Sequence, residues 1–133
     1  METWANRVFD SSQAVCGGAI RSLSIEKLRF TQRGLDVVCK HLRRFGFPSE
    51  TPREALMVER LEALVIRPER IASSWERQFY AHELREFVRY RRLGIHGEGT
   101  WEEWNNAHTA ALKDYGVVDA ESMLYDPEVG PPR

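Results

Sequence analysis

Residues 79–86 contain two side chains that can transfer protons or bind a metal ion. His82 and Glu86 are four residues apart, so a helix places both on one face, about 6 Å from each other. An imidazole and a carboxylate at this spacing can share one divalent metal ion or one substrate. The stretch differs from the His-Glu-x-x-His motif of zinc proteases, because Glu86 stands in place of the second histidine. Taken alone, the spacing equally fits a solvated histidine and a glutamate that pairs with Arg89 or Tyr90 on the surface.

A second histidine, His108, lies within an apolar stripe of the predicted helix 101–115. We therefore expect His108 to be at least partly buried, and a buried imidazole needs a polar partner. A loop of only seven or eight residues separates this helix from the predicted helix 74–92, so the two can pack antiparallel. The sequence thus predicts that His82, Glu86 and His108 form one cluster, which is able to act catalytically or to bind a metal ion.

Two further residues are candidates for the same site. His41 follows the apolar stripe of the predicted helix 32–45, and Asp36 lies five residues before it. Together they can bring a second imidazole and a second carboxylate to the cluster, so both are candidate catalytic residues. Alternatively, Asp36 pairs with Lys40 one helical turn later. We expect His96 to be exposed, because it lies in a glycine-rich loop that lacks a phosphate-binding pattern.

Basic residues gather near the ends of two predicted helices, as Lys40, Arg43 and Arg44 and as Arg85, Arg89, Arg91 and Arg92. Aromatic residues are interleaved with the second group, which is a pattern typical of nucleic-acid binding. The same clusters also fit a simpler role, since cations near a helix C-terminus stabilise the helix dipole. The candidates for holding an anionic substrate are Arg60, Arg85 and Arg89.

The periodicity of apolar residues predicts an all-α protein. Helices are expected over 3–15, 32–45, 52–65, 74–92 and 101–115, with one further turn after Asp119. Three sequences that resemble capping boxes begin at Thr51, Ser73 and Thr100, and each precedes a predicted helix. No stretch alternates like a strand over more than a few residues. We therefore expect a compact single domain of about five helices with a frayed C-terminal tail from about Pro127.

Composition limits the class of protein. A chain of 133 residues with 42% hydrophobic and 29% charged residues matches an ordinary soluble globular domain. Residues 1–97 carry a net charge of +5 and residues 98–133 carry −6, so a basic body adjoins an acidic end. Cys16 and Cys39 lack metal-site spacing. We expect both to be reduced and to be buried as small hydrophobic residues. No apolar run is long enough for a membrane segment, and no signal peptide opens the sequence.

An ordered string of short motifs covers about three quarters of the chain. It comprises Gly34-Leu35-Asp36-Val37-Val38, His41-Leu42, Phe45, Met57, Arg60-Leu61, Phe79-Tyr80, His82-Glu83-Leu84, Glu86, Ala107-His108, Ala110-Ala111-Leu112, Tyr115-Gly116-Val117, Tyr125 and Pro127-Glu128-Val129. In this order the motifs resemble a C-terminal toxin module of bacterial polymorphic toxins, of the Rhs-repeat and contact-dependent-inhibition type. The sequence departs from the pattern at two points. The pattern has a histidine before the final Pro-Glu-Val, where this sequence has Asp126. It also has a glycine-containing turn before Phe79, where this sequence has Arg77-Gln78.

The resemblance implies a division of the chain and a class of function. Residues 1–29 form an N-terminal helix and linker outside it, residues 30–129 form the toxin-like helical domain, and residues 130–133 form a flexible tail. It implies an antibacterial effector that acts in interbacterial competition, with nucleic acid as a substrate and an immunity protein as a partner. The chain is expected to be made in the bacterial cytoplasm. If it is secreted or delivered into a target cell, another segment or machine must carry it.

Two hypotheses about function follow. The first is a small nuclease or hydrolase in which His82 or His108 acts as general acid or base, while Glu86 orients an imidazole or shares a divalent metal ion with both. The second is a non-catalytic helical binding module in which the same residues form a buried structural network. An enzyme should have these residues lining an opening, whereas a structural network should be sealed.

Overall fold

The computed structural model describes residues 18–130, and within them it contains helices and loops but no strand. The α-helices are α1 (Gln32–Leu42), α2 (Pro52–Ile66), α3 (Ser74–Leu93), α4 (Trp101–Asp114) and α5 (Ala120–Leu124). Short 3-10 helices are η2 (Ile25–Lys27), η3 (Arg43–Phe45) and η4 (Pro127–Val129). The predicted all-α class is confirmed, and the helix predicted over 3–15 lies outside the described residues.

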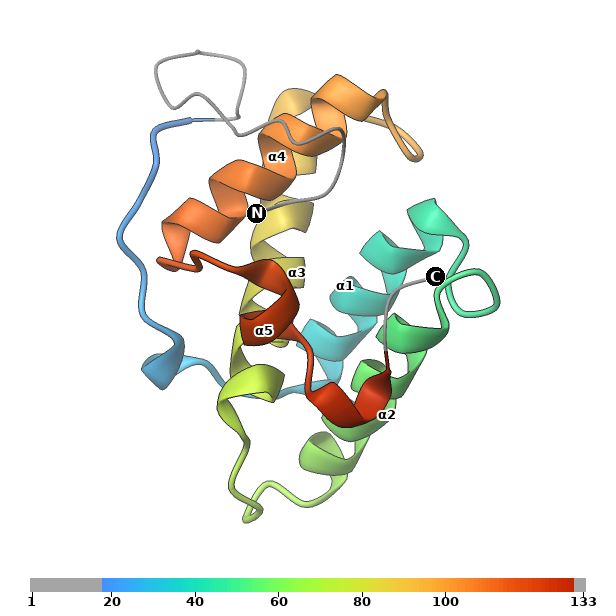
Figure 1. The fold of residues 1–133 in the computed structure, drawn as a ribbon, viewed down its shortest axis with the longest axis vertical. Helices are drawn as coiled ribbons and strands as arrows, with labels where there is room; N and C mark the ends of the chain where they lie inside the picture. The colour runs from blue at the N-terminus through green and yellow to red at the C-terminus, as the bar shows by residue number, and fades with distance from the viewer. Residues whose placement is uncertain (1–17, 131–133) are drawn as a thin grey trace.

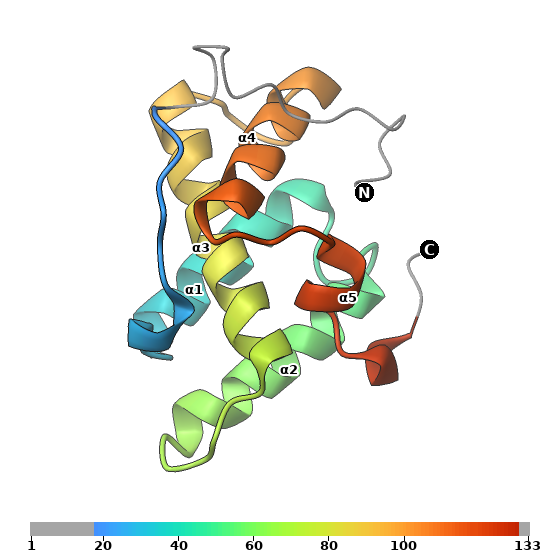
Figure 2. The same ribbon diagram turned by 60° about the vertical axis from the view of Figure 1, so that its left-hand side comes forward.

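Helix α3 is the longest element and lies at the centre of the fold. It packs against α1, α2, α4 and α5, as the two views in Figures 1 and 2 show. A helix with neighbours on several sides buries more than one face, so polar residues on it become buried as well. Every member of the predicted cluster lies on α3 or on a helix packed against it.

Local sequence sets where α3 and α4 begin. The hydroxyls of Ser73 and Thr100 accept hydrogen bonds from the backbone three residues later, and both capping boxes are complete. The third predicted box, at Thr51, is wrong. Thr51 is the residue before α2, but its side chain makes no capping hydrogen bond. The Glu54 carboxylate that should complete the box lies instead 3.6 Å from the Arg53 Nε.

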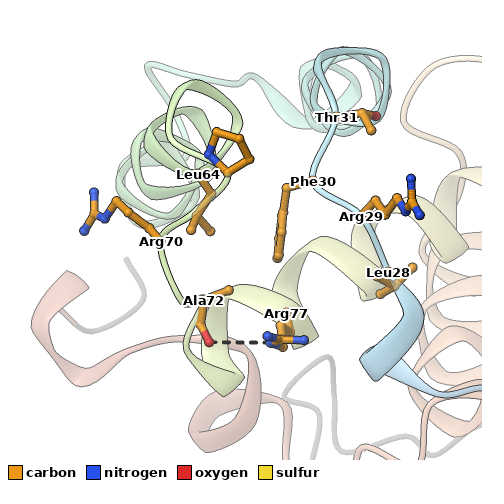
Figure 3. Close-up of a pocket in the computed structure, with 9 residues that line it drawn as sticks. Leu28, Arg29, Phe30, Thr31, Leu64, Arg70, Ala72 and Arg77 are labelled. Atoms are coloured by element: carbon orange, nitrogen blue, oxygen red, sulfur yellow. Dashed lines mark hydrogen bonds between the residues drawn. The ribbon is translucent and has the colours of Figure 1, made fainter.

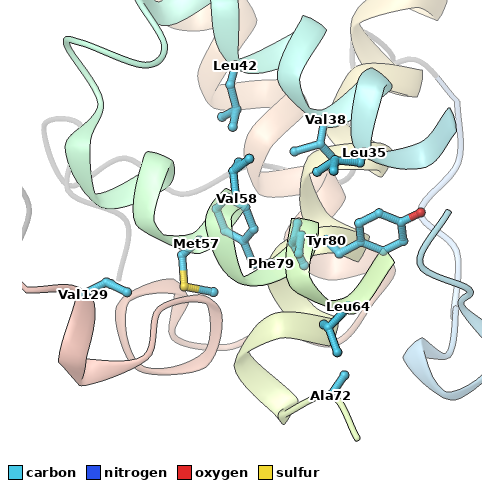
Figure 4. Close-up of a cluster of buried hydrophobic side chains, with 11 residues drawn as sticks. Leu35, Val38, Leu42, Met57, Val58, Leu64, Ala72, Phe79, Tyr80 and Val129 are labelled. Carbon is cyan, nitrogen blue, oxygen red and sulfur yellow. The ribbon is translucent and has the colours of Figure 1, made fainter. Parts of the chain in front are cut away.

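The main hydrophobic core lies between α1, α2 and α3 (Figure 4). Its fully buried members include Val38, Met57, Leu61 and Phe79, one or more from each helix. The C-terminal Val129 is also buried in this core. Residues Pro127–Val129 therefore belong to the fold and not to the predicted tail, because η4 packs against α2.

Two expectations from composition concern the described residues. Among residues 18–130, no helix combines the length and the apolar composition that a membrane crossing needs. Cys39 is a free thiol that is only half-buried, and burial raises its pKa. Cys16 lies outside the described residues.

Candidate functional site

Helices α3 and α4 bring His82, Glu86 and His108 into direct contact. The His82 Nε2 lies 2.9 Å from the Glu86 Oε2, and the His108 Nδ1 lies 2.7 Å from the same oxygen. The two imidazole nitrogens are 2.9 Å from each other. The i, i+4 spacing on α3 accounts for the first contact, and the packing of α4 on α3 for the other two. The predicted convergence is present, and a catalytic role for these residues remains a prediction.

A third imidazole reaches the same carboxylate from α1. The His41 Nε2 lies 2.8 Å from the Glu86 Oε1, the oxygen that the other two histidines leave open. The rings of Phe45 and Tyr90 pack edge-on against His41, with ring centroids 5.4 and 4.9 Å away. Both oxygens of Glu86 are thus used, and the predicted inclusion of His41 in the site agrees with the structure.

Asp36 does not join the cluster, which corrects the prediction that it accompanies His41. Five residues on a helix correspond to a rotation of about 140°, so Asp36 and His41 lie on different faces of α1. The Asp36 side chain is exposed and accepts a 2.8 Å hydrogen bond from the Gln32 amide. The structure pairs Asp36 with Gln32 and not with Lys40, the alternative partner.

Burial and mutual contacts shift the pKa values of two carboxyl groups in opposite directions. Burial by itself raises the pKa of Glu86, but the positive charge of His108 and the hydrogen bonds from three imidazoles lower it well below the ordinary value. Burial and the neighbouring charge of Glu86 hold the pKa of Glu83 well above its ordinary value. Glu83 was not predicted as a site residue. The signal that points to it is its position beside His82 on a helix enclosed by other helices.

The cluster is sealed from solvent. Relative exposure is 0% for His41, 1% for His82, 2% for Glu86 and 8% for His108. The indole of Trp104 stacks on the His108 ring, with centroids 4.5 Å apart and planes inclined by 15°. His96 is exposed, so the prediction that His108 is the more buried of the two is confirmed. By the criterion derived from the sequence, such burial is expected of a structural network.

The three atoms at the centre of the cluster form a triangle that protons cannot fully satisfy. A hydrogen bond needs one proton between two atoms, and an ionised carboxylate oxygen supplies none. If both nitrogens of the triangle carry a proton, His82 and His108 face each other donor to donor. If only one does, the other nitrogen faces the Glu86 Oε2 with lone pair against lone pair. With Glu86 ionised, no placement of protons therefore makes all three contacts hydrogen bonds.

Comparisons with known proteins give no relative from which a role for the cluster can be taken. No protein-family model, no curated protein and no solved structure matches this chain. The resemblance to polymorphic-toxin modules therefore stays an expectation that rests on the ordered motifs.

The arginines predicted to bind substrate have carboxylate partners inside the protein. The Arg85 Nε lies 2.7 Å from Asp114, and the fully buried Arg89 donates two hydrogen bonds to the same carboxylate. The Arg60 guanidinium pairs with Asp126 on the segment that leads into η4. These pairings join separate segments of the chain, and a substrate-binding role for the three arginines remains a prediction.

Two groups of basic residues that are distant in sequence meet on one patch. The Lys40 Nζ and the guanidinium carbons of Arg44 and Arg91 each lie 5.8–5.9 Å from the centroid of the Phe87 ring. This basic patch of Lys40, Arg44, Arg91 and Phe87 adjoins the cluster, because the Phe87 and His41 ring centroids are 6.2 Å apart. The Phe87 ring beneath these cations is buried.

An open pocket of about 340 Å³ lies elsewhere, and its lining includes Phe30, Leu64 and three arginines, Arg29, Arg70 and Arg77. None of the cluster residues lines it. The side chains of Arg29 and Arg70 extend away from Phe30 on opposite sides (Figure 3). These two charges therefore do not converge on the pocket.

Proposed function

We propose that this chain is a metal-dependent nuclease or hydrolase domain of the toxin type, in which His82, Glu86 and His108 hold one divalent transition-metal ion. The observation that carries the proposal is the triangle of ligand atoms within 2.7–2.9 Å of one another. A cation bound to all three atoms turns each lone pair into a metal bond. Imidazole and carboxylate are ligands that zinc and neighbouring divalent metals accept.

The size of the triangle supports this assignment. Zinc bonds to imidazole nitrogen and carboxylate oxygen of about 2.0–2.2 Å place tetrahedral ligands about 3.3 Å from one another. The His82, Glu86 and His108 atoms need to separate by only about half an ångström to reach that spacing. Three protein ligands leave a fourth position for water or substrate, which is the arrangement of catalytic zinc sites. The His41 contact to the other oxygen holds the Glu86 carboxylate in orientation.

Phosphodiester hydrolysis is the reaction that the surroundings favour. A divalent metal ion lowers the pKa of its bound water to about 7 and polarises a phosphoryl oxygen. The basic patch beside His41 supplies positive charge for binding a nucleic-acid backbone. Substrate access requires movement of Trp104, because its indole covers His108, the most exposed member of the cluster.

Growth of bacteria that express the protein tests the toxin part of the proposal. Induction of the wild-type chain should arrest growth, whereas His82→Ala and His108→Ala variants that accumulate as folded protein should not. His96→Ala is the matched control, since His96 is an exposed histidine outside the cluster. Equal toxicity of the wild type and both cluster variants would show that the cluster is structural. A wild type without toxicity would remove the support for an immunity partner.

One observation favours the alternative, a non-catalytic helical binding module. The cluster is sealed and joins three helices through His41 on α1, His82 and Glu86 on α3, and His108 on α4. A buried polar network of this kind fixes the packing of helices. Metal analysis of protein purified without chelator distinguishes the two functions: bound metal supports the enzyme, and protein that takes up no zinc, cobalt or manganese supports the structural network.

A further inference from the structure

The two oxygens of the Glu86 carboxylate face two different sets of side chains. The Oε2 lies within 2.7–2.9 Å of His82 and His108, and the Oε1 lies 2.8 Å from His41. Besides the first triad, a second group of ligand atoms lies within 4.8 Å of one another, from His41, Glu83 and Glu86. All members of both groups are buried, and Glu86 is the residue that they share.

Helix geometry explains why Glu86 can serve both groups. Viewed down α3, Glu86 lies about 40° from His82 and about 60° from Glu83, on the arc between them. Helix α3 therefore provides one side chain for each group and a carboxylate between them. The packed helices complete the pattern, because His108 on α4 contacts the His82 side and His41 on α1 contacts the other oxygen.

We propose that a second divalent metal ion binds between His41, Glu83 and Glu86, so that the Glu86 carboxylate bridges two ions. This inference rests on the proposed function, since it adds a second ion to the site at His82, Glu86 and His108. A carboxylate that gives one oxygen to each ion is compatible with a metal separation of about 3.5–4 Å, as in two-metal hydrolytic sites. Helical proteins build such carboxylate-bridged centres from inward-facing glutamates and histidines.

A second ion would allow both buried glutamates to be charged. A buried carboxylate is costly unless a cation lies next to it. Without a second ion, burial beside Glu86 favours the neutral form of Glu83. A second ion places positive charge between the two carboxylates, and two divalent ions with two carboxylates have a net charge of +2, which favours a phosphodiester as the anionic ligand.

The number of metal ions per chain tests the proposal. Metal-free protein is dialysed against zinc or manganese salts and its metal content is measured by mass spectrometry. We expect two ions per wild-type chain and per His96→Ala chain, and one ion per Glu83→Gln chain. Glutamine has nearly the volume of glutamate, so the substitution leaves no cavity in the protein interior. The manganese form should also give an electron paramagnetic resonance spectrum of two coupled ions, and Glu83→Gln should give that of an isolated ion.

Each outcome separates the second site from the first. One ion per wild-type chain, with no change in Glu83→Gln, overturns the second site and leaves the proposed metal site at His82, Glu86 and His108 intact. No bound metal overturns both. Two ions in both the wild type and Glu83→Gln, with uncoupled spectra, assign the additional ion to an adventitious surface position and also overturn the bridged centre.

Discussion

Replacing Glu86 by glutamine should lower the free energy of unfolding of the metal-free protein by about 3–5 kcal/mol. The Glu86 carboxylate is 2% exposed and lies within hydrogen-bond distance of three imidazoles. Removal of one partner from a buried charged group leaves the others without compensation, which is the origin of the expected cost. Glutamine keeps the shape of the side chain but removes the charge, and its NH2 group turns one acceptor into a donor that faces an imidazole.

The loss of unfolding free energy in Glu86→Gln should depend on pH. The pKa of Glu86 in the folded protein is well below its ordinary value of 4.5, which applies to the unfolded chain. Its contribution to stability is therefore fully present above pH 4.5 and is lost as the pH falls toward the lower folded value. The difference in unfolding free energy between the wild type and Glu86→Gln should shrink as the pH is lowered below that point.

Urea unfolding monitored by circular dichroism, with chelator present, measures both effects. Glu62→Gln is the matched control, because Glu62 is exposed on α2 and the same substitution there should change stability by no more than about 0.5 kcal/mol. If Glu86→Gln unfolds at the same urea concentration as Glu62→Gln at pH 7, Glu86 does not act as a charged acceptor for the three imidazoles. A difference that persists undiminished at low pH would contradict the assigned direction of the pKa shift.

Three further predictions concern other contacts. Asp114→Asn leaves the buried Arg89 without its carboxylate and should cost about 3–5 kcal/mol in urea unfolding; a cost below 1 kcal/mol would mean that the guanidinium finds other compensation. Ser73→Ala removes a capping hydroxyl and should cost about 1 kcal/mol, whereas Thr51→Ala should cost much less because that hydroxyl makes no capping bond. Equal costs would contradict this difference. Trp104→Ala uncovers His108 and should speed removal of bound zinc by a chelator, followed with a colorimetric indicator; an unchanged rate would show that the indole does not control access.

Helices could be predicted from the sequence because their signals are local. Apolar periodicity and capping residues act within a few positions, and α2, α3 and α4 begin where the sequence predicts and end within one residue of the predicted ends. The contact of His82 with Glu86 is also local, since one helical turn separates them. Thr51 marks the limit of this approach. A capping box requires both the right residues and the right backbone conformation, and the Thr51 backbone (φ −131°, ψ 63°) does not direct its hydroxyl to the helix amides.

Packing between helices decided the rest of the site. Whether His41 or Asp36 reaches Glu86 depends on which face of α1 contacts α3, and that face is selected by the whole core. The pairing of Arg85 and Arg89 with Asp114 joins residues 25 or more positions apart, so no local pattern in the sequence indicates it. The sequence by itself determined an all-helical chain and the residue types able to bind a metal ion. The tertiary structure decided which of these residues meet and that the meeting point is out of contact with water. Both the contacts and the burial depend on side chains contributed by separate helices.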